Sequence, residues 1–273
     1  MKKNIQNTSS LFCVGLLLLL FTQVGTAQSI SVGKWRAGSA RELIGNIYTL
    51  IFFVSGPNDE WSKTEKQEMM QKLDESQRWL QKQAKRYNVK VNFEERGQFG
   101  LDKDIKLPHI ARGTASGTEP VDWVSKLMYA VGYTSTQQFV DWAATNTKTK
   151  NTHVVIFVKG KGNGYAMPSS TEMNRELYFL EGTVLYEKFP NGYELPSSAI
   201  SHEVLHLYGA WDFYKTFRQT SENEAKAKKQ FPNSVMLRTS YYIDELEVDE
   251  VSAWRVGWNQ RPKSWYLGFE PPE

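Results

Sequence analysis

Residues 200–212 of the 273-residue chain read ISHEVLHLYGAWD, a stretch that contains the pattern H-E-x-x-H. An α-helix advances about 100° per residue, so His202 and His206 lie on one face about one turn apart. Two imidazoles in this arrangement can bind one Zn²⁺ ion. Glu203 is offset from that row by one step around the helix, where it can act as a general base on a water molecule at the metal. The stretch therefore predicts a zinc-binding helix.

The residues after the second histidine extend this pattern. Gly209 comes three residues after His206, and glycine adopts the left-handed conformation that ends a helix at little cost. The chain can then turn back and bring Asp212 to the metal as a third ligand. A simple turn residue after a helix end is the other interpretation of Asp212.

The full pattern H-E-x-x-H-x-x-G-x-x-D resembles the metzincin clan of zinc endopeptidases, in the form whose third ligand is an aspartate. Residues 234–236, which read SVM, are similar to the Met-turn that lies below the metal in that clan. The resemblance covers residues 200–238 and departs at Arg238, where astacin-like and serralysin-like families carry a tyrosine. Tyr241 and Tyr242 follow, but neither can be aligned with that tyrosine.

The resemblance implies a secreted zinc endopeptidase with one catalytic Zn²⁺, held by His202, His206 and Asp212. Glu203 would take a proton from the attacking water and pass it to the leaving amine. Met236 would form an apolar floor below the metal; an ordinary core methionine is the alternative. The implied fold is α+β and metzincin-like, with a small twisted mixed sheet, long helices, the metal helix and a C-terminal helix.

Two other interpretations remain open at this point. In a thermolysin-like (gluzincin) arrangement a glutamate on a later helix is the third ligand, and Glu224, Glu245 and Glu247 are candidates. The second is a non-catalytic protein that keeps the zinc-protease fold and binds peptides or glycans. The intact Glu203 argues against that second interpretation, because a binding protein has no need of the base.

The first 27 residues have the features of a secretory signal peptide. Lys2 and Lys3 precede an apolar run over residues 11–21, which is too short to span a membrane as a stable helix, and residues 25–27 are small. Processing as a lipoprotein at Cys13 is the less favoured alternative, because that cysteine lies inside the apolar run. The sequence thus predicts a secreted or periplasmic protein. Cys13 is the one cysteine of the chain, and export without disulfides favours a bacterial source.

Residues 28–273 are predicted to form one metallopeptidase domain. Residues 28–45 read as a short pro-segment or an N-terminal arm. The expected strands are 46–54, 89–93, 151–158 and 177–186, and the expected helices are 64–87, 121–131, 137–144, the metal helix, 221–229 and 243–256. The helical region at about 119–146 is interpreted as an insertion into a minimal zinc-protease core.

A short extended segment precedes the metal helix in sequence. Tyr165, Ala166 and Met167 follow a glycine-rich turn and a buried strand. Metzincins carry an edge strand at this place, so these three residues are predicted to pair with an extended peptide substrate, and Pro168 would end that pairing.

The charge of the chain limits its partners. The formal net charge is +3, and loss of Lys2 and Lys3 with the signal peptide reduces it to +1. Such a balance argues against a nucleic-acid partner. A protein or peptide substrate, no stable membrane insertion after signal removal, and a monomer are expected.

Overall fold

The computed structural model describes residues 36–107, 119–147, 149, 151–170 and 179–272, which all belong to one compact unit. The predicted signal peptide over residues 1–27, including Cys13, lies outside these ranges. Among the described residues, no helix combines the length and the apolar character needed to cross a membrane.

Strand β1 (Gly45–Ser55) is the centre of a six-stranded sheet. The strands lie in the order β2-β1-β4-β6-β5, and β3 also pairs with β1. Every pairing is parallel except that of β5 with β6. The other strands are β2 (Val91–Phe99), β3 (Ile105–Lys106), β4 (Asn151–Lys161), β5 (Tyr165–Met167) and β6 (Gly182–Lys188). The molecule is therefore a mixed α/β protein with a mostly parallel sheet.

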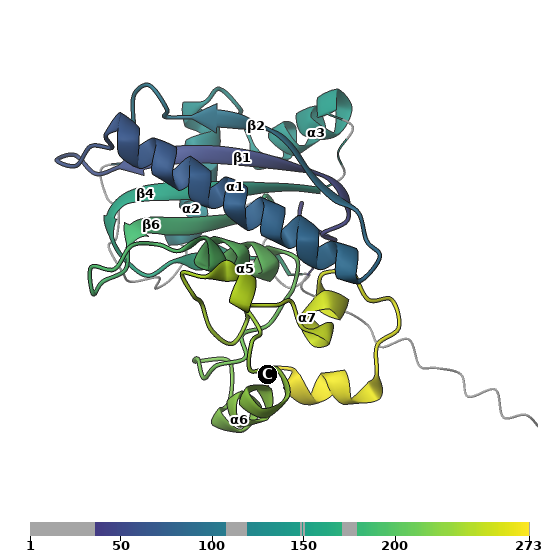
Figure 1. Ribbon diagram of the computed structural model, residues 1–273. Helices are drawn as coiled ribbons and strands as arrows, with labels where there is room; N and C mark the ends of the chain where they lie inside the picture. Colours follow the sequence, from purple (N-terminus) through teal and green to yellow (C-terminus); the bar gives the residue numbers. More distant parts are fainter. Residues whose placement is uncertain (1–35, 108–118, 148, 150, 171–178, 273) are drawn as a thin grey trace, which may run out of the picture. The chain divides into compact units, whose positions relative to one another are not determined.

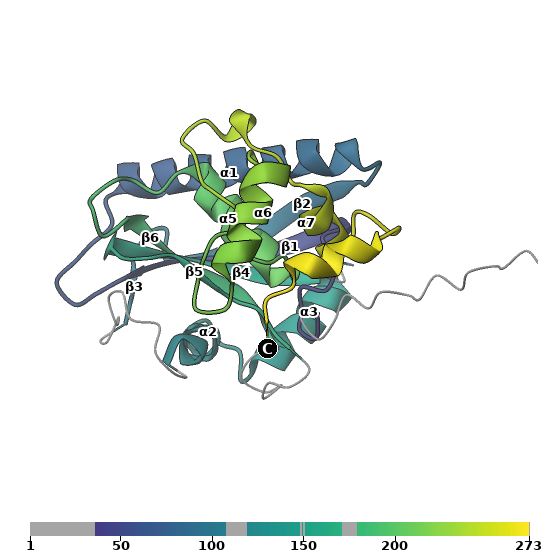
Figure 2. The same ribbon diagram turned by 90° about the horizontal axis from the view of Figure 1, so that it is seen from below.

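Helices cover both faces of this sheet (Figures 1 and 2). Helix α1 (Lys63–Arg86) and helix α5 (Ser197–Leu207) lie on one face, and α2 (Glu119–Ala130) and α3 (Thr136–Thr147) lie on the other. Parallel strands are usually buried on both faces in this way, which explains why β1 and β4 read as continuous apolar runs.

Helices α2 and α3 are part of the hydrophobic core. Trp123, Leu127 and Phe139 pack in one cluster with alternate residues of β1 and β4, among them Phe52 and Ile156. The two predicted helices exist, and they cover a face of the sheet that would otherwise be exposed to water. Their interpretation as an insertion relative to a minimal zinc-protease core stays a prediction.

Helix α1 begins with a complete capping box. The Ser62 hydroxyl accepts the Glu65 backbone N–H, and the Glu65 carboxylate accepts the Ser62 backbone N–H. The helix then packs against α5 through two small residues, since the hydroxyls of Ser76 and Ser201 lie 2.7 Å apart. This contact places α5 directly on α1, the longest of the described helices.

The predicted C-terminal helix over residues 243–256 is wrong as one element. A 3-10 helix, η1 (Ile243–Glu245), is followed by an extended piece whose Glu247 forms a β-bridge with Ser234. Helix α7 (Glu250–Arg255) comes next. The cause of the break is Asp249. Its buried carboxylate accepts the backbone N–H groups of Val251 and Ser252 and so starts a new helix.

Other expectations need smaller changes. Of the expected strand 177–186, residues 177–178 lie outside the described residues, and strand β6 runs over Gly182–Lys188. Strand β4 continues to Lys161, into the predicted glycine-rich turn. The remaining elements are α6 (Ser221–Gln230) and η2 (Ser264–Phe269), which lie with α7 beyond α5 (Figure 1). The aromatic residues of η2 pack inward: Trp265 stacks on Phe231 with ring centroids 6.2 Å apart.

The described part of the N-terminal segment, residues 36–44, is held by the rest of the fold. The Ser39 backbone N–H donates to the Phe179 carbonyl at 2.8 Å, and the Leu43 N–H donates to the Val256 carbonyl at 2.9 Å. The Ala40 N–H donates to the buried Glu181 carboxylate at 2.6 Å. These bonds favour the interpretation of this part as an arm of the domain.

A buried polar chain connects the sheet to the metal helix. His153 of β4 is fully buried; its Nε2 lies 3.2 Å from the Thr49 hydroxyl and its Nδ1 lies 2.9 Å from the Tyr208 hydroxyl. His153 is therefore a histidine within the sheet whose two ring nitrogens both have hydrogen-bond partners. Burial lowers the pKa of His153 to about 3, so it is neutral at neutral pH.

We therefore expect His153 to make the protein sensitive to acid. Between about pH 6.5 and about pH 3 the unfolded chain binds a proton at this side chain and the folded chain does not. Stability is then complete above pH 6.5 and falls by up to about 1.4 kcal/mol per pH unit as the pH drops through that window. Urea unfolding as a function of pH should show this slope in the wild type and a smaller slope in His153→Gln. Parallel curves would contradict the assignment.

Candidate metal centre

Helix α5 carries two of the three side chains of the candidate site. The helix begins directly after Pro196 and is buried on almost all sides. It ends in a Schellman motif: the Ala210 N–H donates to the Leu205 carbonyl at 3.1 Å, and the Gly209 N–H donates to the His206 carbonyl at 2.9 Å. The φ of Gly209 is +93°, the left-handed value expected for it. The chain reverses here, as its sequence predicts.

The reversal brings Asp212 to the two histidines. The Asp212 Oδ1 lies 3.2 Å from the His202 Nε2 and 3.1 Å from the His206 Nε2, and the two Nε2 atoms are 3.1 Å apart. In the part of the chain that the structure describes, this is the one group of three or more His, Cys, Asp or Glu side chains able to hold a metal ion.

The hydrogen bonds of the imidazoles determine which atoms face this point. The His202 Nδ1 lies 2.9 Å from the Val235 carbonyl, and the His206 Nδ1 lies 2.8 Å from the Ala210 carbonyl. A carbonyl only accepts, so in the neutral imidazoles each Nδ1 carries the proton and donates it, and each Nε2 presents a lone pair. A hydrogen bond from the ring nitrogen that does not face the metal is typical of histidines that ligate metals.

The three converging atoms fit a cation. Two imidazole lone pairs and a carboxylate oxygen repel one another at these separations unless a proton or a metal ion lies between them. Three tetrahedral ligand atoms, each about 2.0–2.1 Å from a zinc ion, would be about 3.3–3.4 Å from one another. The observed 3.1–3.2 Å is close to that value.

The charges of the group are coupled in the metal-free protein. Burial lowers the pKa of His206, but the Asp212 carboxylate more than offsets this and holds the pKa at about 9. Burial raises the pKa of Asp212, but the opposite effect of His206 and His202 is larger. The net result is a pKa well below the usual range of an aspartate. A proton thus takes the place that a metal ion can occupy, and metal binding has to displace it.

Glu203 faces a hollow of about 340 Å³ next to His202. Burial raises the pKa of its carboxyl group, which His202 and His206 partly counteract. A β-carbon on Gly164 would lie 3.7 Å from the Glu203 Oε1, so the chain just before β5 runs beside this carboxylate. Glu203 is not a member of the metal group, in agreement with its predicted offset around the helix.

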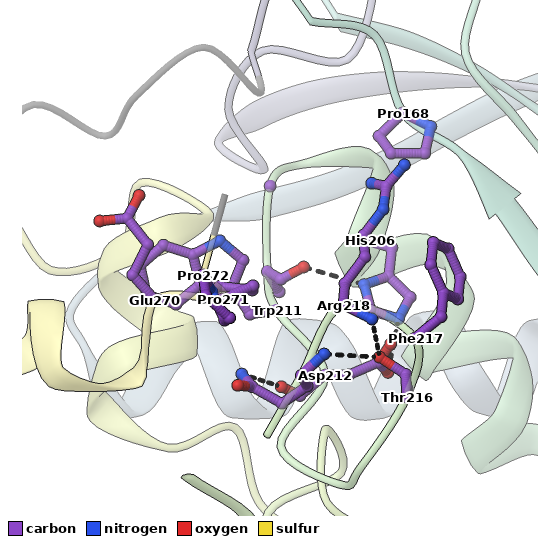
Figure 3. Close-up of a pocket in the computed structure, with 13 residues that line it drawn as sticks. Pro168, His206, Trp211, Asp212, Thr216, Phe217, Arg218, Glu270, Pro271 and Pro272 are labelled. Atoms are coloured by element: carbon purple, nitrogen blue, oxygen red, sulfur yellow. Dashed lines mark hydrogen bonds and ion pairs between the residues drawn. The ribbon is translucent and has the colours of Figure 1, made fainter.

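A second hollow, of about 440 Å³, lies on the His206 and Asp212 side of the group (Figure 3). Trp211, Phe217 and Pro168 are among its lining residues, and the Phe217 side chain is 92% exposed. Gly164 lines the first hollow and Pro168 lines the second. Strand β5 therefore extends from one hollow to the other along the free edge of the sheet. The predicted edge strand Tyr165–Met167 lies beside the candidate metal centre.

The turn at residues 234–237 supports the group from below. Met236 is fully buried, and its carbonyl accepts the Phe213 N–H at 2.8 Å, directly after Asp212. The carbonyl of the preceding Val235 orients His202. The turn thus contacts both helix α5 and the loop that carries Asp212. The role of the Met236 side chain as an apolar floor stays a prediction.

Arg255 of α7, which is remote in sequence, contacts the loop between His206 and Asp212. Its Nε donates to the Gly209 carbonyl at 2.7 Å, and its guanidinium lies 4.2 Å from the centre of the Trp211 ring. Gln219 adds a bond from its Nε2 to the Asp212 carbonyl at 2.9 Å. No spacing rule in the sequence connects these residues to the metal motif.

Tyr214 is a site residue that the sequence interpretation missed. Its ring stacks on the His202 imidazole with centroids 5.9 Å apart, and it lines the hollow that contains Glu203. Burial, followed by the Asp212 and Glu203 carboxylates, raises the pKa of its phenol. The available signal was its position two residues after Asp212. By contrast, Tyr241 donates to the Glu194 carbonyl and Tyr242 is 73% exposed.

Comparisons with known proteins provide little further guidance. No family model matches the chain, and no curated protein matches its sequence. Among solved structures, wild-type OgpA from Akkermansia muciniphila is similar over 82% of this chain at 11% identity, with a TM-score of 0.39. This chain spans 62% of the length of that one. A similarity of this size assigns neither the fold nor the function, which rest on the geometry above.

The glutamates considered as alternative third ligands are engaged elsewhere. Glu224 pairs with Lys228 and accepts the Lys215 N–H, and Glu247 pairs with Arg86. The Glu245 carboxylate contacts the Ser240 hydroxyl. None of the three belongs to the candidate metal group.

Removal of individual carboxylates should identify the third ligand. We expect Asp212→Ala to reduce bound zinc well below one ion per chain after dialysis, because a ligand and the charge that balances the metal are both lost. Glu224→Ala and Glu245→Ala are the matched controls and should keep wild-type stoichiometry. Elemental analysis decides the matter; full zinc in Asp212→Ala with loss in either control would favour the thermolysin-like arrangement.

Proposed function

We propose that the protein is a zinc-dependent endopeptidase. The observation that carries this proposal is the convergence of the His202, His206 and Asp212 ligand atoms at 3.1–3.2 Å beside a carboxylate that is not itself a ligand. A structural metal site needs no such neighbouring base, and it usually has four protein ligands instead of three. The metzincin resemblance of the sequence supports the same reaction.

In the proposed mechanism His202, His206 and Asp212 hold one Zn²⁺. When bound, the ion would supply Lewis acidity, which polarises a peptide carbonyl and makes water a stronger acid. Glu203 accepts the proton of the attacking water and transfers it to the nitrogen of the leaving amine. Burial raises the pKa of its carboxyl group, which suits a group that both takes and returns a proton.

The surroundings of the group favour an extended substrate. Strand β5 has a free edge and runs between the two hollows, so a peptide that pairs with Tyr165, Ala166 and Met167 would place the bond to be cut near Glu203. A substrate peptide that occupies both hollows continues on both sides of the candidate metal centre, so the bond near Glu203 would lie within that peptide and not at its end. This argues for cleavage within chains, and we infer protein or peptide substrates.

We infer that Tyr214 assists the reaction. Its ring is held against His202, and its phenol lies in the hollow with Glu203, beside the Asp212 carboxylate. Burial keeps the phenol protonated, so it can donate a hydrogen bond to negative charge that develops on the substrate carbonyl oxygen.

The proposed location follows from the sequence. We propose that residues 1–27 direct export and that the protein acts outside the cytoplasm as a secreted or periplasmic enzyme, as a monomer and without a nucleic-acid partner. Detection of the mature N-terminus at Gln28 in an exported fraction would support this location.

Metal content and hydrolysis together test the proposed function. The purified protein should contain one zinc per chain and cleave an unfolded generic protein, and a zinc chelator should abolish cleavage until zinc is restored. Zinc without any hydrolysis would favour the non-catalytic peptide- or glycan-binding interpretation. Hydrolysis that continues after complete zinc removal would refute the proposal.

The role of Glu203 can be tested by removing its charge alone. Glu203→Gln should retain one zinc per chain and lose activity by about 10²–10⁴-fold, because the amide cannot accept the proton. Near-normal proteolysis by the purified, zinc-loaded variant would rule out Glu203 as the general base.

Tyr214 can be tested by removing its hydroxyl group. Tyr214→Phe keeps the stacking on His202, so zinc content and KM should change little, while kcat should fall by about 10²-fold. A neutral substrate analogue should bind the variant as tightly as the wild type, whereas a phosphonate analogue, which carries negative charge at the carbonyl position, should bind more weakly. Equal effects on both analogues would indicate a structural role.

A further inference from the structure

The hollow beside Glu203 has a distinctive composition. Four apolar residues, Leu185, Phe189, Leu195 and Ala199, contribute to its lining. The remaining lining residues are Asn163, Gly164, His202, Glu203, Tyr214, Arg238 and Thr239. Arg238 is therefore the one lysine or arginine that reaches this pocket.

The charge of Arg238 is not neutralised by the described residues. Its Nε donates to the Pro232 carbonyl at 3.2 Å, and its Nη2 donates to the Asn233 side-chain oxygen at 3.2 Å. Both acceptors are neutral. Throughout the described ranges no carboxylate forms an ion pair with this guanidinium, and the residue is exposed. Arg238 thus brings to the pocket a positive charge that has no ion-pair partner among the described residues, and Glu203 is the carboxylate on the same lining.

The pocket also lies on the proposed substrate path. It contains Glu203, and its Gly164 wall leads directly into β5. A peptide paired with β5 therefore has to present one of its side chains or its end to these walls. A positive charge next to apolar walls is complementary to a group with an apolar stem and a negative tip.

We propose that this pocket binds a carboxylate of the substrate, with Arg238 as the group that recognises it. This inference rests on the proposed function. The apolar residues would contact the methylene stem, and the guanidinium would bind the carboxylate oxygens by charge-assisted hydrogen bonds. The carboxylate has two sources, an acidic side chain within a peptide or the free C-terminus of a peptide. The path between two hollows agrees with the acidic side chain.

Peptides that differ in one group test the proposal. A blocked peptide, with both termini capped, is made with Glu, Gln or Lys at the position that enters the pocket, which is found by moving the Glu along the sequence. The zinc-loaded wild type should prefer Glu over Gln in kcat/KM by about tenfold to a hundredfold, the range of one charge-assisted hydrogen bond. Arg238→Gln should abolish this preference, so that kcat/KM for the Glu peptide is no higher than kcat/KM for the Gln peptide. Arg238→Glu should reverse the preference towards Lys.

Matched variants separate charge from structure. Arg238→Lys keeps the charge and should keep part of the preference for Glu. Arg261→Gln removes an exposed arginine that lines neither hollow and should behave as the wild type. Arg218→Gln alters the second hollow. If Arg218→Gln loses the preference for Glu and Arg238→Gln keeps it, the proposal is overturned. A free C-terminus is the source if only uncapped peptides show the preference and it again disappears in Arg238→Gln.

A binding measurement keeps this inference distinct from the proposed function. Analogues of the Glu and Gln peptides with a reduced, uncleavable bond are titrated into wild-type protein and Arg238→Gln, both loaded with zinc. About tenfold tighter binding of the Glu analogue, lost in Arg238→Gln, supports the pocket even if no peptide is cleaved, in which case the proposed peptidase fails alone. Cleavage with equal affinity for both analogues refutes the carboxylate pocket alone.

Discussion

The structure depends on holding three electron-rich atoms at one point. The Nε2 atoms of His202 and His206 and the Oδ1 atom of Asp212 lie 3.1–3.2 Å from one another, although their lone pairs repel. Only a cation between them removes this repulsion, and at neutral pH a proton does so incompletely because it bridges two atoms and not three. The surrounding fold has to supply the free energy that keeps the three atoms together until a metal ion binds.

Backbone groups and packing from distant segments supply that free energy. The carbonyl of Val235 orients His202, and the carbonyl of Ala210 orients His206, so neither imidazole can rotate without breaking a hydrogen bond. Arg255 fastens the end of the metal helix, while the hydroxyl contact between Ser76 and Ser201 fixes that helix on α1. Helices α1 and α7 and the turn at residues 234–237 therefore all contact α5 or its C-terminal turn.

Local patterns allowed much of this to be predicted. The spacing of His202 and His206 depends on helix geometry alone, and the left-handed Gly209 follows from the low steric cost of glycine. Strand β1 and helix α1 were also evident, since their apolar periodicity is strong. The expected C-terminal helix failed because a local helix cap, supported by one contact from a remote residue, outweighed its apolar periodicity. The carboxylate of Asp249 is bonded to the Ser234 hydroxyl and begins α7, which divides the expected C-terminal helix.

The candidate metal ligands and the candidate general base were therefore evident from the chain itself, because all four lie within eleven residues whose geometry is local. The groups around them were not. Tyr214 stacks on His202 and Arg238 reaches the hollow beside Glu203 through the folding of loops, and α2 and α3 belong to the core because they cover the second face of a parallel sheet. These relationships join residues far apart in the chain, and no sequence period encodes them. The amino-acid order specified the chemistry of the centre, and the tertiary contacts specified its surroundings.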